Sequence, residues 1–173
     1  SGFVLAVLIV YLLMVALFRS WLYPFVILIT IPLAASGAFI GVSIAHEVSG
    51  ELVSFDVIAM LGLIILAGIV VNNAILIVHQ ANNFRLAGQG HTAALRASCA
   101  SRFRPICMSV ITSVLGMAPL AFGTGAGTEL YRGLGAVLIG GLVVSTVFTL
   151  FLVPALLSLF YDLQRLLGII NEG

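Results

Sequence analysis

The sequence predicts an all-α membrane protein with five transmembrane helices. Hydrophobic residues make up 62% of the 173 residues and charged residues only 8%, whereas a soluble domain averages about 25% charged residues. So few charges cannot cover a water-exposed surface. The apolar stretches are long and continuous, which excludes the alternating pattern of a membrane-spanning barrel. Five of them reach, or nearly reach, the about 20 residues that a bilayer-spanning helix needs.

The ends of these stretches carry helix signals. Pro24 and Pro105 suit the first turn of a helix, where the N–H that proline lacks has no partner. Ser54 is expected to cap the third helix, and Asp56 favours its first turn. Trp21 follows the first stretch, where an amphipathic ring prefers the membrane interface. The predicted spans cover residues 3–18, 24–45, 56–79, 105–122 and 133–161.

Charged residues divide unequally between the two ends of these spans. Because arginines concentrate on the cytoplasmic side of membrane proteins, the side with six arginines is predicted to be cytoplasmic and to include the C-terminus. Five spans then place the N-terminus outside. The arginine-rich side holds Arg19, Arg85, Arg96, Arg102, Arg104 and Arg165, and the other side holds Arg132, Glu47, Glu51, Asp56 and Glu129.

One long connector, residues 80–104, is predicted on the cytoplasmic side. Gly88 and Gly90 interrupt it, and Thr92 is expected to cap a short helix over residues 93–100. We expect this helix to lie along the membrane interface with its arginines toward lipid headgroups. A wholly solvated loop is the alternative.

The start of the chain suggests a piece of a longer protein. It opens Ser1-Gly2-Phe3 and is apolar at once, with no initiator Met. It also lacks the charged region and small-residue cleavage site of a signal peptide. We therefore expect something upstream to cross the membrane first, and the chain to be a C-terminal portion.

Polar residues inside the spans require an explanation, because a polar side chain within the bilayer is unfavourable in free energy. Asn72 and Asn73 lie within the third span. Arg102 and Ser109 are seven residues apart, so they share one face if the fourth helix extends back through Pro105. Two interpretations stay open: hydrogen bonds that hold helices together, worth roughly 0.6–2 kcal/mol each, or a transport pathway.

Small residues within the spans predict close helix packing, since they let backbones approach. The second, third, fourth and fifth spans all contain them at helical spacing. The glycines expected at helix contacts are Gly37, Gly41, Gly68, Gly116, Gly140 and Gly141.

Composition and residue spacing argue against several functions. The formal net charge of +1 gives no sign of nucleic-acid binding. Cys99 and Cys107 match no metal-ligand spacing. The sequence has neither a nucleophile–base set nor a metal-ligand cluster, so we expect no enzyme and no cofactor. No Asp or Glu lies deep within a span, since Asp56 is at the very start of the third. Either a missing part supplies the proton carrier, or the protein is not proton-driven.

Several short sequence segments resemble those of the resistance-nodulation-division (RND) efflux transporters of the hydrophobe/amphiphile type. They occur in that family's order and at similar spacing over essentially the whole chain. The matching strings cover residues 18–24, 68–78, 102–109, 116–120 and 123–127, followed by 140–141 and 153–154.

This resemblance implies a C-terminal part of a twelve-helix transporter built from two repeats, in a bacterial inner membrane. It implies that the chain packs against the N-terminal repeat and the lipid bilayer. The whole protein is then expected to be a homotrimer that joins a periplasmic adaptor and an outer-membrane channel. Proton influx is expected to drive export of drugs or other amphiphiles, without a cofactor.

By the same resemblance, Asn72, Asn73, Arg102 and Ser109 match a proton relay. Asn72 departs from the pattern, because some relatives have a Lys there that pairs with aspartates of the other repeat. A neutral amide cannot form that ion pair, although it can hydrogen-bond to a carboxyl group. Two alternatives remain: another RND exporter of lipid or protein, and a membrane scaffold whose polar groups only join helices.

Overall fold

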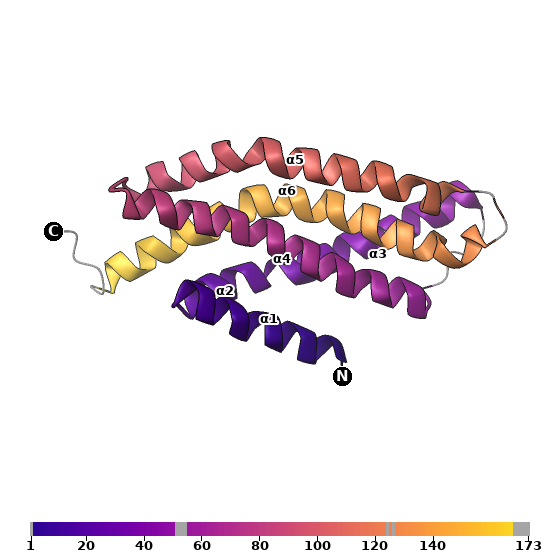
Figure 1. Cartoon of the computed structure of the whole chain (residues 1–173), viewed down its shortest axis with the longest axis horizontal. Helices are drawn as coiled ribbons and strands as arrows, with labels where there is room; N and C mark the ends of the chain where they lie inside the picture. The colour runs from indigo at the N-terminus through magenta and orange to yellow at the C-terminus, as the bar shows by residue number, and fades with distance from the viewer. Residues whose placement is uncertain (1, 51–54, 124, 126, 168–173) are drawn as a thin grey trace.

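The structure is a computed structural model that describes residues 2–50, 55–123, 125 and 127–167. The described chain is helical, without β-strands, and its helices run side by side along one long axis (Figure 1). The prediction of an all-α protein is confirmed. The helices are α1 (Gly2–Phe18), α2 (Leu22–Leu28), α3 (Thr30–Ser49), α4 (Val57–Leu86), α5 (His91–Phe122) and α6 (Thr128–Leu166).

Four segments of the described chain are long and apolar enough to cross a membrane. These are Leu22–Val48, Val57–Leu86, His91–Phe122 and Thr128–Leu166. The first predicted span corresponds to a shorter apolar helix, Val4–Phe18. The five predicted stretches are therefore all helical, and four of them reach spanning length.

The second span is broken between α2 and α3. Pro32 has no N–H to donate to the carbonyl group of Leu28, which weakens the helix at this point. The Thr30 hydroxyl donates to the carbonyl oxygen of Ile27 at 2.5 Å and so satisfies a neighbouring acceptor. Such substitution by a hydroxyl is how membrane helices tolerate a proline.

The predicted connector, residues 80–104, differs from the structure. Helix α4 continues to Leu86 and α5 begins at His91, so only a tight turn joins them. The helix expected over residues 93–100 is present, but it is the first part of α5 and not a separate interfacial element. Gly90 takes the N-cap position in place of Thr92.

The difference arises because Pro105 does not lie in the first turn of a helix, as the sequence suggested, but in the interior of one. Helix α5 runs through Pro105 and Pro119 without interruption. Each proline removes one backbone hydrogen bond, and membrane helices accept this more often than soluble ones. At the start of α4, Asp56 is the N-cap and accepts from the backbone N–H of Ala59 at 2.9 Å; Ser54 lies outside the described residues.

Helix α6 is the centre of the bundle, and α3, α4 and α5 all pack against it. Helices α3 and α6 approach so closely that a Cβ atom on Gly41 would lie 2.7 Å from the Cα atom of Gly140. A Cβ on Gly37 would lie 3.0 Å from the Gly140 carbonyl oxygen. Gly141 faces Leu66 of α4, whose Cδ1 would be 2.9 Å from an added Cβ. These glycines permit the contacts of α6 with α3 and α4.

Gly68 and Gly116 differ from this group. Within the described chain no atom lies within 4 Å of a Cβ added at either position, and both residues are exposed. The close packing expected of them therefore does not occur inside this chain.

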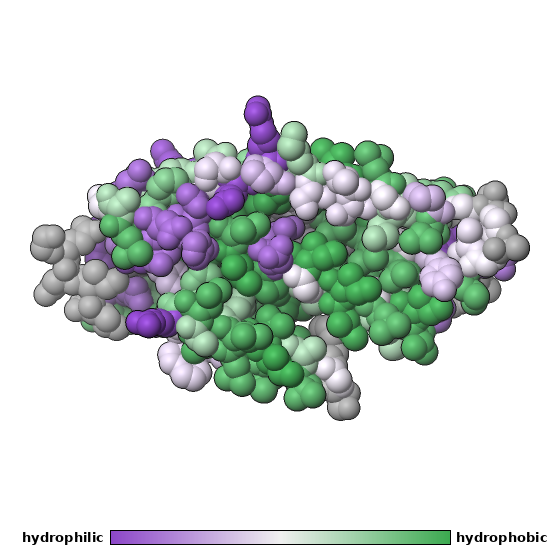
Figure 2. Space-filling view, viewed as in Figure 1, coloured by the Kyte–Doolittle hydropathy of each residue, from purple (hydrophilic) through white to green (hydrophobic). Residues whose placement is uncertain are grey.

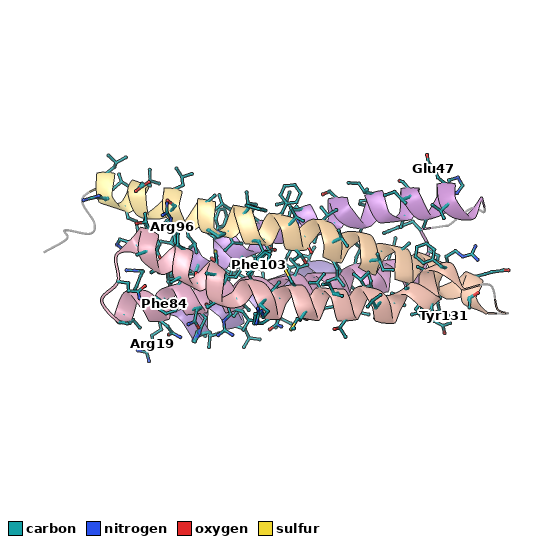
Figure 3. All side chains as sticks on the ribbon, turned by 90° about the horizontal axis from the view of Figure 1, so that it is seen from above. Arg19, Glu47, Phe84, Arg96, Phe103 and Tyr131 are labelled. Carbon is teal, nitrogen blue, oxygen red and sulfur yellow. The ribbon has the colours of Figure 1, made fainter. Side chains whose placement is uncertain are left out.

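The two ends of the bundle differ in charge, as the sequence predicted, but Arg102 and Arg104 do not lie at the arginine-rich end. They lie within α5, on either side of Phe103, which is near the middle of the bundle (Figure 3). Arg19, Phe84 and Arg96 lie at one end, and Glu47 and Tyr131 lie at the other (Figure 3). Figure 2 shows hydrophobic residues over much of the visible face, while hydrophilic residues gather toward the end that holds the C-terminus of α6. Glu51 lies outside the described residues.

Candidate functional site

The two adjacent asparagines of α4 point in different directions. Consecutive residues of a helix are about 100° apart, so the two asparagines can have different surroundings. Asn73 is 6% exposed and shares its face with Val70 and Ile77, which are also buried. Asn72 is exposed, one turn from the exposed Gly68. The bundle therefore buries Asn73 and presents Asn72 outward.

Arg102 connects α5 to α4. Its Nη2 atom donates to Oε1 of Gln80 at 3.0 Å. The guanidinium is half-buried, and its Nε atom is buried with no hydrogen-bond partner among the described residues. Buried polar atoms are normally satisfied. Arg102 thus has a donor available for a group that the described chain does not supply.

Gln80 was missed in the sequence because the third span was ended at His79. The signal was present: Gln80 follows Asn73 by seven residues, which is two helical turns on the same face. A longer span would have placed Gln80 in a helix beside Arg102.

The hydroxyl groups of α5 fall into two kinds. Those of Thr112 and Ser113 donate to the carbonyl oxygens of Met108 and Ser109, both at 2.8 Å. They follow the usual pattern of bonding within their own helix. The Ser109 hydroxyl is exposed and has no partner in the part of the chain described. Of these three, only Ser109 is available to another molecule or domain.

Asn72 and Ser109 are each close to the middle of their helices, α4 and α5. The exposed residues around them are mostly large and apolar. On α4 the exposed Leu61, Ile64 and Ile65 lie two to three turns before Asn72, and on α5 the exposed Met108, Ile111 and Leu115 lie within two turns of Ser109. Polar groups in the middle of an apolar, membrane-length surface are expected to meet a protein partner and not lipid.

No described acidic residue faces these groups. The carboxyl groups lie near helix ends, where Asp56 caps α4 and the others are exposed: Glu47, Glu129 and Asp162. No cluster of three or more metal-ligating side chains occurs among the described residues. The structure therefore brings Arg102 against α4 through Gln80, and leaves Asn72 and Ser109 as exposed polar groups without a described partner.

The sequence pattern of the AcrB/AcrD/AcrF family matches residues 2–161. The chain is also similar to the X-ray crystal structure of a heavy metal efflux pump, with a TM-score of 0.76 and 29% sequence identity. That similarity covers 90% of this chain and 15% of the pump, so the chain spans a small part of the pump's length. Because the family pattern covers nearly all of the apolar helical bundle, the chain is a multi-pass membrane protein of the AcrB/AcrD/AcrF family of RND transporters, whose members are transporters and not enzymes.

Proposed function

We propose that this chain is the C-terminal membrane portion of a proton-driven exporter of drugs or other amphiphilic compounds in a bacterial inner membrane. In this proposal it supplies half of a proton-relay interface. The exposed positions of Asn72 and Ser109, in the middle of an apolar surface, are the observation that supports it most strongly. The buried, unpartnered Nε atom of Arg102 adds to this support.

The other half of the interface consists of carboxyl groups on the N-terminal repeat. Arginine remains charged in proteins, so Arg102 attracts such a carboxyl group while it is ionised. Asn72 and Ser109 supply hydrogen bonds, which differ between the charged and the protonated carboxyl. Protonation removes the attraction to Arg102, shifts the packing of the two repeats, and is read out by the rest of the transporter.

The assembled protein in this proposal is a homotrimer with a periplasmic adaptor and an outer-membrane channel. It is of the hydrophobe/amphiphile type, on the basis of the Asn-Asn string in α4 and the glycine-rich string at residues 123–127. Its energy source is the proton gradient, and it needs no cofactor.

A metal ion is the second candidate cargo, because the similar structure is a heavy metal efflux pump. Zinc and other transition metals are bound by clustered thiolate, imidazole and carboxylate ligands. The described residues hold no such cluster, so this candidate depends on ligands elsewhere in the transporter. Export assays with Cu(I) and Zn(II) beside a fluorescent cationic dye would separate the two cargoes.

The proposed function is tested by Arg102→Ala in the intact transporter. We expect loss of dye efflux driven by a pH gradient, with trimer assembly unchanged. Arg104→Ala is the matched control, because Arg104 is an exposed arginine two residues further along α5. Arg102→Lys keeps a positive charge and should retain part of the activity. Normal efflux by Arg102→Ala would contradict the proposal.

A further inference from the structure

A cluster of one arginine and two tyrosines lies at the arginine-rich end of the bundle. The Arg85 Nη1 atom donates to the Tyr23 hydroxyl oxygen at 2.7 Å and to the Tyr161 hydroxyl oxygen at 3.2 Å. The two hydroxyl groups are 3.0 Å apart and share a hydrogen bond. These residues come from α2, α4 and α6, so the cluster ties three helices together.

Tyr161 is the centre of this cluster and is only 7% exposed. The Arg85 Cζ atom lies 4.8 Å from the centroid of its ring, a cation–π distance. The His91 ring of α5 lies 4.4 Å from the same ring. The phenol hydroxyl of Tyr161 is therefore held in one position by contacts from three other helices.

The cluster has one hydrogen-bond donor more than it has acceptors. An arginine only donates, so both phenol oxygens accept from Arg85. One of the two phenols then donates its hydrogen to the other. The tyrosine that accepts this bond still has its own O–H, and that O–H has no acceptor among the described residues. Buried donors are rarely left unpaired. The cluster therefore needs an acceptor.

The charge of the cluster is also unbalanced. Within the described residues no carboxylate forms an ion pair with Arg85; its hydrogen-bond partners are the two phenols. Arg19 and Arg96 lie at the same end of the bundle (Figure 3). A half-buried guanidinium without a counter-charge is unfavourable, so the missing acceptor is expected to be an anion and not water alone.

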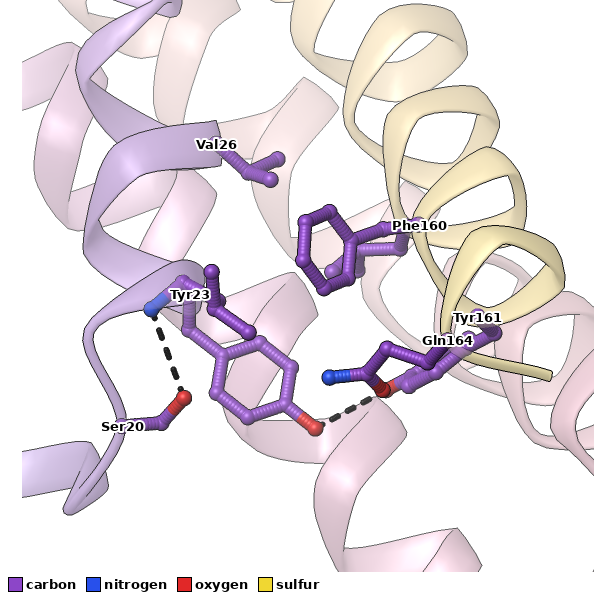
Figure 4. A pocket seen from close by; sticks show the side chains of 8 residues that line it. Ser20, Tyr23, Val26, Phe160, Tyr161 and Gln164 are labelled. Carbon is purple, nitrogen blue, oxygen red and sulfur yellow. Dashed lines mark hydrogen bonds between the residues drawn. The ribbon is translucent and has the colours of Figure 1, made fainter. Parts of the chain in front are cut away.

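A small cavity opens beside the two tyrosines (Figure 4). Its volume is about 40 Å³, which is room for a few water-sized groups. Ser20 and Gln164 add a hydroxyl and an amide to its lining, next to the apolar side chains of Val26 and Leu157. Neither the Ser20 O–H nor the Gln164 amide N–H has an acceptor in the described part of the chain.

We propose that this cavity is a binding site for a phosphate group, with one phosphate oxygen inserted between Tyr23, Tyr161 and Gln164. Arg85 lies behind the phenols, polarises them and supplies the positive charge. The rest of the phosphate stays at the mouth of the cavity, among the headgroups, at the level of the exposed Trp21. The source is an anionic phospholipid headgroup or a free phosphate. The site is separate from the proposed relay and does not depend on it.

The test uses the purified protein in its full natural length, in dodecyl maltoside micelles. Dioleoylphosphatidylglycerol, inorganic phosphate and dioleoylglycerol are added separately, and the shift in Tm is measured, since a ligand that binds the folded state raises Tm. Native mass spectrometry counts the bound lipids. We expect phosphatidylglycerol to raise Tm and the phosphate-free dioleoylglycerol not to.

The variants are Arg85→Gln, Tyr23→Phe and Tyr161→Phe, each compared with its own ligand-free Tm so that a loss of folding is not read as a loss of binding. We expect each to weaken the apparent affinity for phosphatidylglycerol about tenfold or more, which is typical of a lost charge-assisted hydrogen bond. Arg96→Gln, which removes an exposed arginine of the same end, should stay within about twofold of the unmodified protein.

If only phosphatidylglycerol stabilises the protein, the site binds a lipid headgroup. If inorganic phosphate also stabilises it, the site binds free phosphate as well as the headgroup. The proposal is overturned if neither phosphate compound stabilises the protein. It is equally overturned if Arg96→Gln loses as much affinity as Arg85→Gln, because the effect would then be general attraction to the arginine-rich end.

Discussion

Arg102 of α5 donates a hydrogen bond to Gln80 of α4 across 3.0 Å. This contact holds the guanidinium beside α4 while its Nε atom remains without a described partner. The neutral acceptor is important, because a carboxylate at position 80 would form an ion pair within the chain and compete with any acid from outside it.

Replacing this acceptor should therefore alter transport. Gln80→Glu is expected to hold Arg102 in an ion pair and to lower pH-gradient-driven dye efflux in the intact transporter. Gln80→Leu removes the acceptor and should lower efflux less, because the charge of Arg102 stays free. Initial efflux rates in inverted vesicles measure both. Equal rates for Gln80→Glu and the unmodified protein would show that Arg102 has no role in coupling.

The exposed polar residues separate a transporter from a scaffold. Asn72→Leu and Ser109→Ala should abolish most of the proton-coupled efflux, whereas each lost hydrogen bond to the partner repeat should lower the free energy of unfolding by only about 0.6–2 kcal/mol. If the protein is a scaffold, the same substitutions should lower its stability, and it has no transport activity for them to reduce. Efflux rates and thermal unfolding of the same preparations distinguish the two outcomes. Asn73→Leu serves as the comparison, because Asn73 is buried.

The contact between α3 and α6 predicts a strong effect of added volume. A side chain at Gly41 collides with the backbone of Gly140, so Gly41→Val should destabilise by about 1–3 kcal/mol or more. Thermal unfolding in detergent measures this. Gly116→Val is the matched control, because its Cβ meets nothing within 4 Å in the described chain.

Gly68→Val and Gly116→Val examine the outer surface. In the assembled transporter, Gly68 and Gly116 should tolerate valine only if no helix of another repeat packs on them. Size-exclusion chromatography measures assembly. If Gly68→Val or Gly116→Val leaves the chain's own fold intact but prevents assembly, the partner repeat packs on this face of α4 and α5.

The predicted orientation is tested by labelling at the two ends shown in Figure 3. In a protein whose Cys99 and Cys107 are replaced by serine, a cysteine at position 96 should react with a membrane-impermeant maleimide only after the cells are opened. A cysteine at position 47 should react in cells whose outer membrane is permeabilised. The opposite pattern would reverse the orientation derived from the arginines.

Composition and apolar run length were enough to predict the membrane class, the all-α fold and the approximate positions of the apolar helices. These follow from the sequence because a bilayer requires long apolar stretches whose backbone hydrogen bonds are made internally. The charge difference between the ends was readable in part, because Arg85 and Arg165 lie in the last turns of apolar helices, whereas Arg102 and Arg104 lie within α5. Resemblance between several strings pointed to the RND family, to which the chain belongs.

Only the tertiary structure decided which polar groups are buried and which are presented outward. Asn72 and Asn73 are adjacent residues of the same type, yet the packing of α4 in the bundle buries Asn73 and leaves Asn72 exposed. The partners of Arg102 and Arg85, 22 and 62 to 76 residues away in sequence, likewise follow from how the helices pack. Residue type and spacing specify a helix and its faces, but the direction in which each face is covered depends on contacts between helices distant in the chain.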